Sequence, residues 1–286
     1  MATTIITNYA KRRLSFKMKQ SLKYFFQFKY SQRKVYLGIF YAYFFILSGY
    51  GLMNSSLHWL WLSLIGFIIF RNIGFEIAGH RYLCHESFEA KNNIAKYVMA
   101  ICSAFGFYGS NLFWSPGHAF HHDTADTIKD PHSPHFYKIQ GKTWLDVLVP
   151  QTQDPDWSIP LKYYSKLTKK AEVMFVHNYY WLIVLPPFVL LHFIEWRICA
   201  FLWALPLLLA APSVFIINWT THLKGYRNFD TDDKSYNNTL INFLSLGGGL
   251  HNNHHYDPSA YNTKMSDKWY ETDFLNVFII EKFLKK

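Results

Sequence analysis

Residues 35–70, VYLGIFYAYFFILSGYGLMNSSLHWLWLSLIGFIIF, contain no Asp, Glu, Lys or Arg. Small and polar residues at 51–56 divide this stretch into two apolar pieces. Because a helix needs about 20 residues to cross the hydrocarbon core of a bilayer, the second piece has to continue past Arg71 to about residue 78. We therefore expect a membrane-spanning hairpin with helices over about 35–53 and 57–78.

The same pattern occurs again further along the chain. Residues 173–194 and 198–223 are free of charged side chains, and only Glu195, Trp196 and Arg197 separate these two uncharged segments. They predict spans over about 174–194 and 198–221. The uncharged segment 97–115, which is rich in Gly, Ser and Asn, predicts one partly embedded helix. The expected fold class is all-α, with four transmembrane helices in two hairpins under a cytosolic helical cap.

Positive charge is concentrated near the N-terminus. Residues 1–75 hold ten Lys and Arg and no acidic residue, so the whole net charge of +10 lies there, and nine of the ten fall between Lys11 and Lys34. The positive-inside rule places this basic segment, residues 1–34, in the cytoplasm. Two hairpins then return 79–172, 224–286 and the C-terminus to the same side, as parts of a single domain over 35–286. Since the basic run leads directly into apolar stretches, we expect a lipid bilayer and not nucleic acid as its partner.

Nine of the fourteen histidines form a pattern. Two triads share the spacing i, i+3, i+4, which places three side chains on one face of a helix, so each triad can present its imidazoles to a common point. Imidazole is a ligand for Zn, Cu, Fe and Ni, and nine histidines with one amide would overfill one ion and suit two. These candidate metal ligands are His80, His85, His118, His121, His122, Asn218, His222, His251, His254 and His255.

Several other residues have both a functional and an ordinary interpretation. Asp123, Asp126 and Asp130 could orient ligating imidazoles or be solvated loop carboxylates. Arg71 and Glu76 could contact the histidines, although we expect them to reach towards the membrane interface. The tail 269–286 is either an interfacial helix or packs on the cap. We assign packing roles to the five remaining histidines, which are His58, His132, His135, His177 and His192.

The histidine motifs resemble those of the membrane-bound fatty acid desaturases, in particular the delta-9 acyl desaturase (stearoyl-CoA desaturase-like) branch. The three histidine boxes of that family are HxxxxH, HxxHH and a third box near the C-terminal end. They are matched by His80 and His85, by His118, His121 and His122, and by His251, His254 and His255, while Asn218 and His222 match an NxxxH element. Trp114 and the Asp130-Pro131-His132 element also resemble that branch.

The resemblance implies a non-haem di-iron centre held by these ten residues, with Asn218 reaching a metal through water and no catalytic residue apart from the ligands. It implies an O2-dependent desaturase that introduces a cis double bond, at delta-9, into a long saturated acyl chain carried by CoA, acyl carrier protein or a lipid. Electrons would come from a small carrier such as cytochrome b5, ferredoxin or rubredoxin with its reductase. The protein would be a multi-pass protein of a bacterial inner membrane or the endoplasmic reticulum.

The match departs from the family pattern in ways that leave alternatives open. Pro116 and Gly117 stand where acyl-CoA enzymes carry Arg and Asp, which leaves the head group of the substrate undecided. Membrane di-iron hydroxylases and alkene-forming decarboxylases share the boxes. A metal transporter would place histidines at mid-membrane depth, whereas these are expected at span ends. No Glu is followed by His at i+3, so the soluble di-iron bundle class is excluded.

Overall fold

The computed structural model describes residues 33–106, 109–141 and 159–286, with the backbone alone for 33–37. Over these ranges the chain is helical, without strands and with only isolated bridges between extended residues. The expected all-helical fold class is therefore confirmed for the described residues. The basic segment expected over 1–34 lies almost wholly outside them.

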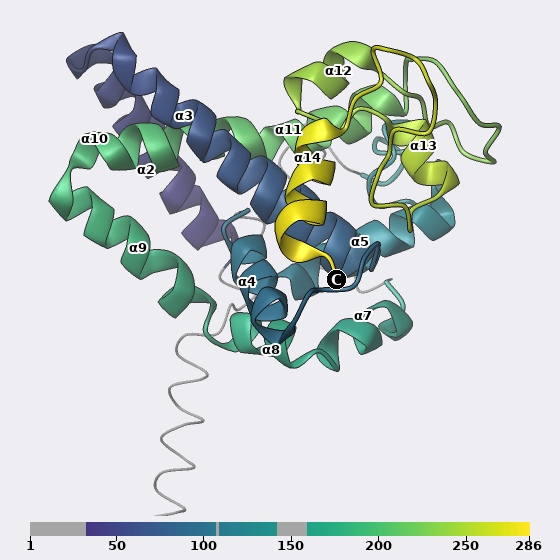
Figure 1. The fold of residues 1–286 in the computed structure, drawn as a ribbon, viewed down its shortest axis with the longest axis horizontal. Helices are drawn as coiled ribbons and strands as arrows, with labels where there is room; N and C mark the ends of the chain where they lie inside the picture. The colour runs from purple at the N-terminus through teal and green to yellow at the C-terminus, as the bar shows by residue number, and fades with distance from the viewer. Residues whose placement is uncertain (1–32, 107–108, 142–158) are drawn as a thin grey trace, which may run out of the picture.

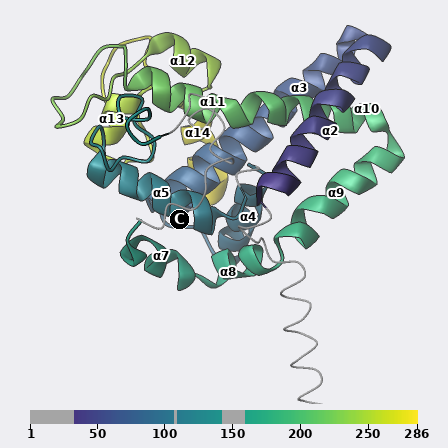
Figure 2. The same cartoon turned by 180° about the vertical axis from the view of Figure 1, so that it is seen from behind.

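The first two long helices follow one another across a short turn (Figures 1 and 2). The first is α2, Arg33–Asn54. The second is one continuous helix, Leu57–Cys84, made of η2 (Leu57–Trp59), α3 (Leu60–Phe67) and the π-helical η3 (Ile68–Cys84). The predicted hairpin is therefore present as a pair of helices, but the second helix continues to Cys84 instead of ending near residue 78. The extra turns carry His80.

The second pair of helices differs from the prediction in its first member. Helix α8 (Ala171–Asn178) and helix α9 (Tyr180–Ile194) meet at Tyr179 with a bend of 61°, so the span expected over 174–194 is broken. The partner is a continuous helix, Trp196–Thr221, made of α10 (Trp196–Ile198), η5 (Cys199–Ala204) and α11 (Leu205–Thr221). It begins at Glu195, whose carboxylate accepts a hydrogen bond from the Arg197 backbone N–H at 3.1 Å.

Two of these helices, Leu57–Cys84 and Trp196–Thr221, are long and apolar enough to cross a membrane, and α8 with α9 makes a third if the bent pair is one span. Helix α2 is 22 residues long, but its first side chains lie outside the description. The chain is thus a membrane protein with two to three candidate spans among its described residues. The count of four spans stays a prediction.

The segment that was expected to form one embedded helix over 97–115 forms parts of two, and that expectation is wrong. Helix α4, Asn93–Ala104, begins at Asn92, whose side chain accepts a hydrogen bond from the Ala95 N–H. Helix α5, Asn111–Thr124, has its own N-cap at Ser110. Gly109, with a φ of +81°, precedes that cap in a conformation that favours glycine. Helix α7, Leu161–Thr168, follows after the segment 142–158.

The C-terminal region is built from short helices joined by loops. These are α12 (Thr239–Leu244), α13 (His251–Tyr256), α14 (Phe274–Ile279) and η6 (Ile280–Leu284). Side-chain amides hold the loops in place: Asn238 caps α12, and the Asn242 amide donates to the Thr272 carbonyl at 2.8 Å. Figure 1 shows α12 and α13 on the side of the molecule away from the α9–α10 turn, with α14 between them and α3.

Two apolar cores stabilise this arrangement. The larger lies among the long helices and includes Phe44, Tyr180 and Phe201. The second joins the end of η3 to α4, α5, α8 and η6 through residues such as Ile77, Met99 and Ile280. Burial of apolar side chains is the main favourable term in folding. The second core therefore fixes the ends of η3 and α5, the two elements that carry the first two histidine boxes.

Candidate metal centre

The nine candidate histidines come from four elements that are distant in the sequence. The last turns of η3 carry His80, and His85 follows directly as its C-cap. Helix α5 carries the second box, His222 caps α11, and α13 consists largely of the third box. The structure brings all nine side chains together where these elements meet, between the long helices and the C-terminal region.

The histidines form two groups, and in each group one nitrogen per residue lies within 4.8 Å of all the others. The five-histidine group contains His80, His85, His118, His122 and His254. The four-histidine group contains His121, His222, His251 and His255. Two separate clusters of this composition fit two metal sites better than one.

The i, i+3, i+4 triads could each have served one common point, but the structure divides both of them between the two groups. His118 and His122 of α5 join the five-histidine group, while His121 joins the other group. In the third box, His251 and His255 belong together and His254 crosses over. At about 100° per residue, positions i and i+4 are about 40° apart around a helix. Position i+3 lies about 60° from position i in the other direction, so it is about 100° away from position i+4. Each box therefore supplies both groups.

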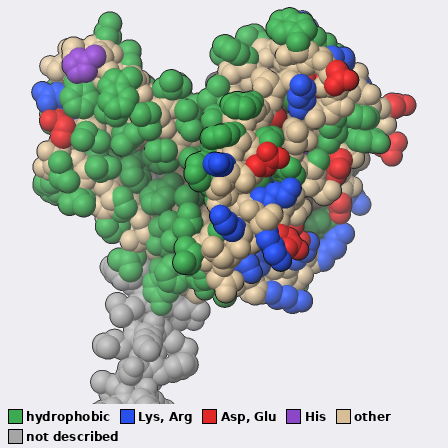
Figure 3. All heavy atoms as spheres, viewed as in Figure 1, with side chains coloured by type: hydrophobic (Ala, Val, Ile, Leu, Met, Phe, Trp, Pro, Cys, Tyr) green, Lys and Arg blue, Asp and Glu red, His purple; other side chains and the backbone are tan. Residues whose placement is uncertain are grey.

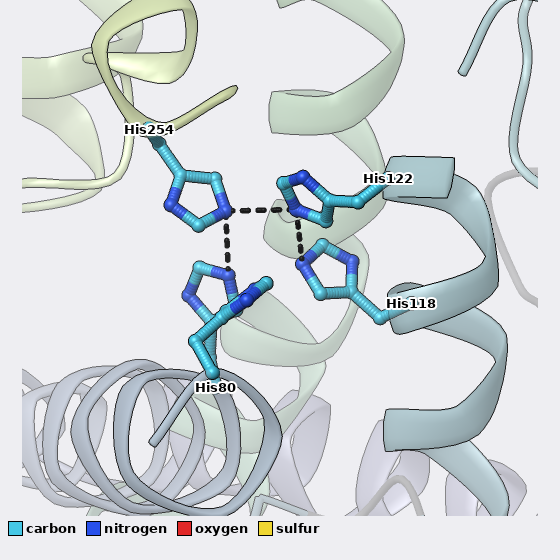
Figure 4. Close-up of side chains that lie close together, drawn as sticks. His80, His118, His122 and His254 are labelled. Carbon is cyan, nitrogen blue, oxygen red and sulfur yellow. Dashed lines mark hydrogen bonds between the residues drawn. The ribbon is translucent and has the colours of Figure 1, made fainter. Parts of the chain in front are cut away.

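The Nε2 atoms point into the centre of each group. In the five-histidine group, His254 Nε2 lies 3.1 Å from His80 Nε2 and 3.0 Å from His122 Nε2, as the dashed lines in Figure 4 show. His118 Nε2 lies 3.2 Å from His122 Nε2. In the four-histidine group, His222 Nε2 and His251 Nε2 are 3.0 Å apart.

Carboxylates bind the opposite nitrogen, Nδ1, of four histidines. His121 Nδ1 lies 2.8 Å from Asp130 Oδ1, and His222 Nδ1 lies 2.8 Å from Asp126 Oδ2. Nδ1 of His255 lies 2.7 Å from Asp233, and Nδ1 of His80 lies 3.2 Å from Glu76. A carboxylate accepts a hydrogen bond from the Nδ1–H group, so the neutral ring has its lone pair on Nε2. Four lone pairs are thereby aimed at the two group centres.

The donor set fits metal ions. The buried Nε2 atoms of His85, His121 and His255 have no hydrogen-bond partner among the described residues. An unpaired buried polar atom is costly, and several lone pairs directed at one point are satisfied by a cation. Carboxylate-held imidazoles are the usual outer partners of metal-ligating histidines. The clusters therefore meet the requirements of a metal site in direction, donor type and number.

Burial keeps most of these imidazoles neutral, which is the form that binds metal. It lowers the pKa of His85, His118, His122, His251 and His254 well below the usual range, and the neighbouring histidines add to the effect. Burial also lowers the pKa of His255 to about 3, against the opposing charge of Asp233.

His121 is the exception. Burial again disfavours its charged form, but the adjacent Asp130 carboxylate outweighs burial and raises its pKa.

The three carboxylates that we considered as partners of the histidines have different positions in the structure. Asp126 and Asp130 each hold a histidine of the four-histidine group. Asp123 instead is exposed and contacts Lys162 and Tyr163 away from the clusters. Asp233, which holds His255, was not considered at all, because a contact between residues 22 positions apart on separate loops leaves no local pattern. The four-histidine group thus has three carboxylate partners and the five-histidine group has one.

The expectation that Arg71 and Glu76 reach towards the membrane interface is wrong. Both are buried, with relative exposures of 1% and 4%. The Arg71 guanidinium donates to Glu76 Oε2 at 2.9 Å, and Arg81 Nε donates to Glu76 Oε1 at 3.1 Å. Arg81 also pairs with Asp273, at 2.7 Å. This network links the His80 ring, through Glu76 and Arg81, to the loop before α14.

An apolar cavity lies against both groups. It encloses about 590 Å³, counting its open mouth. Phe75, Trp114, Val214, Phe215, Ile217 and Leu250 form its apolar wall, and His80, His118, His251 and His254 reach it from the two groups. Asn218 also lines the cavity and donates to the His132 carbonyl at 3.0 Å, without joining either histidine group.

Of the five histidines that we assigned to packing, two lie at the site. His132 lines the cavity, and His135 Nε2 donates to the His222 carbonyl and lies 3.6 Å from Asp126. The Asp130-Pro131-His132 element, which resembles the delta-9 branch, was the feature of the sequence that could have indicated a place for these two histidines at the site. The other three contact Ser56, Ser110 and Tyr43, which are ordinary packing partners.

The glycines before the third box allow the close approach that brings His251 to the site. Gly247 has a φ of +116°, which favours glycine. A Cβ on Gly248 would lie 2.2 Å from an Arg71 guanidinium nitrogen, and one on Gly249 would lie 2.2 Å from the Asn242 backbone nitrogen. No side chain fits at either position without moving its neighbours.

Comparison with known proteins agrees with this geometry. The family model for fatty acid desaturases matches residues 54–275. The sn-2 palmitoyl-lipid 9-desaturase of Nostoc sp. is 31% identical over 250 residues, which cover 84% of this chain and 82% of that protein. The sn-1 stearoyl-lipid 9-desaturase of Anabaena variabilis is 23% identical over 227 residues, covering 78% and 81%. A probable acyl-CoA desaturase of Schizosaccharomyces pombe is 29% identical over 225 residues, covering 73% of this chain and 44% of that protein.

The family match covers most of the chain and includes every candidate histidine. The histidine clusters fit a metal site, and the apolar helices are compatible with a location in a membrane. This chain belongs to the fatty acid desaturase family and is an oxidoreductase of lipid metabolism.

Proposed function

We propose that this protein is an O2-dependent acyl desaturase that introduces a cis double bond at delta-9 of a long saturated acyl chain. The observation that carries the proposal is the apolar cavity onto which histidines of both groups open. An apolar chain in this cavity would place its methylene groups beside both clusters. The delta-9 position is supported by the Nostoc and Anabaena relatives, which are both named as lipid 9-desaturases.

Two iron ions are the proposed cofactor, one in each histidine group. The five-histidine group would hold one ion and the four-histidine group the other, while Asn218 would reach a metal through water. Bound iron would supply the oxidising power for removing hydrogen from an unactivated methylene pair, which no side chain of the chain could supply. The protein side chains hold the imidazoles neutral and oriented, and the aromatic wall of the cavity excludes water from the acyl chain.

A glycerolipid is the proposed carrier of the acyl chain. The Nostoc relative, which matches over most of both chains, is named for a palmitoyl-lipid substrate. Pro116 and Gly117 also replace the charged pair expected for acyl-CoA enzymes. A pulse of labelled saturated fatty acid tests this carrier, because the unsaturated product should appear first on glycerolipids. Product that appears first as acyl-CoA or on acyl carrier protein would contradict it.

We further propose four transmembrane helices with the basic N-terminus, the C-terminus and the histidine clusters on the cytoplasmic side, in a bacterial inner membrane or the endoplasmic reticulum. The distribution of Lys and Arg supports this orientation. Electrons would come from a separate small carrier such as cytochrome b5, ferredoxin or rubredoxin with its reductase, since the sequence has no dinucleotide-binding glycine motif in a strand–helix setting.

The fatty-acid profile of a host that lacks its own desaturase tests the reaction. We expect cells that express this chain to contain a new monounsaturated acid, located at delta-9 by gas chromatography with mass detection. A hydroxylated acid or a terminal alkene would overturn the desaturase proposal while leaving the metal centre in place. Unchanged lipids from a protein that binds two irons, in a host that also expresses a reductase and an electron carrier able to reduce that protein, would overturn the proposed substrate.

The carboxylate behind His121 gives a prediction about metal retention. Asp130→Asn keeps the size of the side chain but removes the charge that holds His121 at 2.8 Å. We expect iron affinity of the four-histidine group to fall by about 10- to 100-fold, as is typical when an outer partner of a ligating histidine is lost. Competition with a graded series of chelators measures the change. Asp123→Asn is the matched control, because Asp123 is exposed and contacts Lys162 instead; equal iron retention in the two variants would contradict the role of Asp130.

A further inference from the structure

The C-terminal region exposes a group of large apolar side chains that neither core absorbs. We call this group the apolar cap face; it consists of Leu240, Phe243 and Leu244 of α12 and Phe274, Phe278 and Phe283 of α14–η6, which are 47% to 74% exposed. The rings of Phe274 and Phe278 have centroids 5.9 Å apart, and those of Phe278 and Phe283 are 6.2 Å apart. The three phenylalanines of α14–η6 thus form a continuous exposed apolar patch, and such patches mark contact with a partner or a membrane.

A buried amide fixes the apolar cap face against the second long helix. Asn72 lies in η3 and is fully buried. Its amide donates to the Leu246 carbonyl, just after α12, and to Asn276 Oδ1 of α14, both at 3.1 Å. The Asn276 amide in turn donates to the Leu246 carbonyl at 3.1 Å. Helices α12 and α14 therefore meet at the level of Asn72.

The position of Asn72 along its helix sets the depth of this contact. Asn72 comes 15 residues after Leu57, where the helix begins. At about 1.5 Å per residue this is about 22 Å, which is less than the hydrocarbon thickness of about 30 Å. The same helix exposes large apolar side chains from Leu57 to Ile69, as a helix in contact with lipid would. The parts of α12 and α14 that touch Asn72 thus lie inside the hydrocarbon core or at its cytoplasmic edge.

The charges around the apolar cap face also favour a lipid surface. Lys282 and Lys286 are exposed beside Phe283 in the last turns of the chain. Interfacial helices combine an apolar face with lysines that interact with anionic head groups. Figure 3 shows hydrophobic side chains running from α3 to the adjacent edge of α14, with Lys and Arg gathered below, around the C-terminus.

We propose that α12 and α14–η6 are inserted in the cytoplasmic leaflet, with the apolar cap face in the boundary between head groups and acyl chains. This inference rests on the proposed membrane span at Leu57–Cys84. The occupant of the apolar cap face is lipid, because the cap meets the second long helix at Asn72, directly after the lipid-facing side chains that run from Leu57 to Ile69. Gly248, which follows Leu246 closely, lines the cavity, so insertion places one wall of the cavity beside the acyl chains of the leaflet.

Photocrosslinking of the full chain in membranes tests the insertion. The photoreactive residue p-benzoylphenylalanine replaces Phe243, Phe274 or Phe278, which are all exposed aromatic residues that it mimics in shape. We expect lipid adducts by mass spectrometry at all three positions. Leu64, 61% exposed on α3, is the lipid-facing control, and Asp230, whose side chain is fully exposed, is the aqueous control.

Each outcome decides the proposal. Lipid adducts at the three cap positions in yields like that at Leu64, with none at Asp230, would support it. Adducts with a second copy of the chain or with another protein, or no adduct at these positions while Leu64 reacts with lipid, would overturn it and leave the desaturase proposal intact. Absence of lipid adducts at Leu64 as well would overturn the span itself, and with it the inserted cap.

Discussion

His121→Ala is expected to abolish desaturation while leaving the protein in the membrane with one of its two irons. His121 belongs to the four-histidine group, and its removal leaves only three imidazoles there. Loss of an outer partner of a metal ligand costs about 10- to 100-fold, so loss of the ligand itself should lower activity by more than about 100-fold. The five-histidine group does not include His121 and should keep its ion. Elemental analysis should give about one iron per chain.

His254→Ala provides the reciprocal test. His254 belongs to the five-histidine group and lies within 3.1 Å of both His80 and His122. We expect activity to be lost here too. The four-histidine group should keep its iron, whereas the five-histidine group, which has lost His254, should hold its iron less firmly. His58→Ala is the control, because His58 is exposed in the turn before α3 and contacts Ser56. Substantial turnover in either cluster variant would contradict a centre that needs both groups.

Among the carboxylate-to-amide substitutions proposed here, Glu76→Gln is expected to lower the free energy of unfolding the most. The Glu76 carboxylate is buried and accepts from Arg71 and Arg81 while holding His80. Removing one partner of a buried ion pair leaves an uncompensated charge and costs about 3–5 kcal/mol. Since Arg81 retains Asp273, most of the cost should come from Arg71. Thermal unfolding of the purified protein in detergent measures the loss of stability.

A double-mutant cycle identifies the source of that loss. Arg71→Met combined with Glu76→Gln removes both charges of the pair, so we expect the double variant to be more stable than Glu76→Gln alone. Glu281→Gln is the matched control, because Glu281 is exposed and accepts a hydrogen bond only from Tyr261 among the described residues. Strictly additive effects of the two substitutions would show that Arg71 and Glu76 do not stabilise each other.

Local patterns in the sequence were sufficient for the parts of the fold and site that depend on neighbouring residues. Charge-free stretches marked the helices that are apolar enough to cross a membrane, although a single bend at Tyr179 divides one of them. Histidine spacing identified all nine residues that the two groups contain. These features follow from helical periodicity and hydrophobicity, which act over a few residues.

Tertiary structure decided which imidazole belongs to which group and what holds it. The sequence could not show that His121 parts from His118 and His122, because that depends on where α5 lies relative to α11 and α13. Nor could it pair His222 with Asp126, which is 96 residues away, or bury Arg71 beside Glu76. The packing of α12 and α14 against η3 likewise depends on Asn72, through contacts between residues more than 170 positions apart. Such contacts form only when packing brings distant elements together, so their physical cause lies in the assembled core and leaves no periodic mark in the chain.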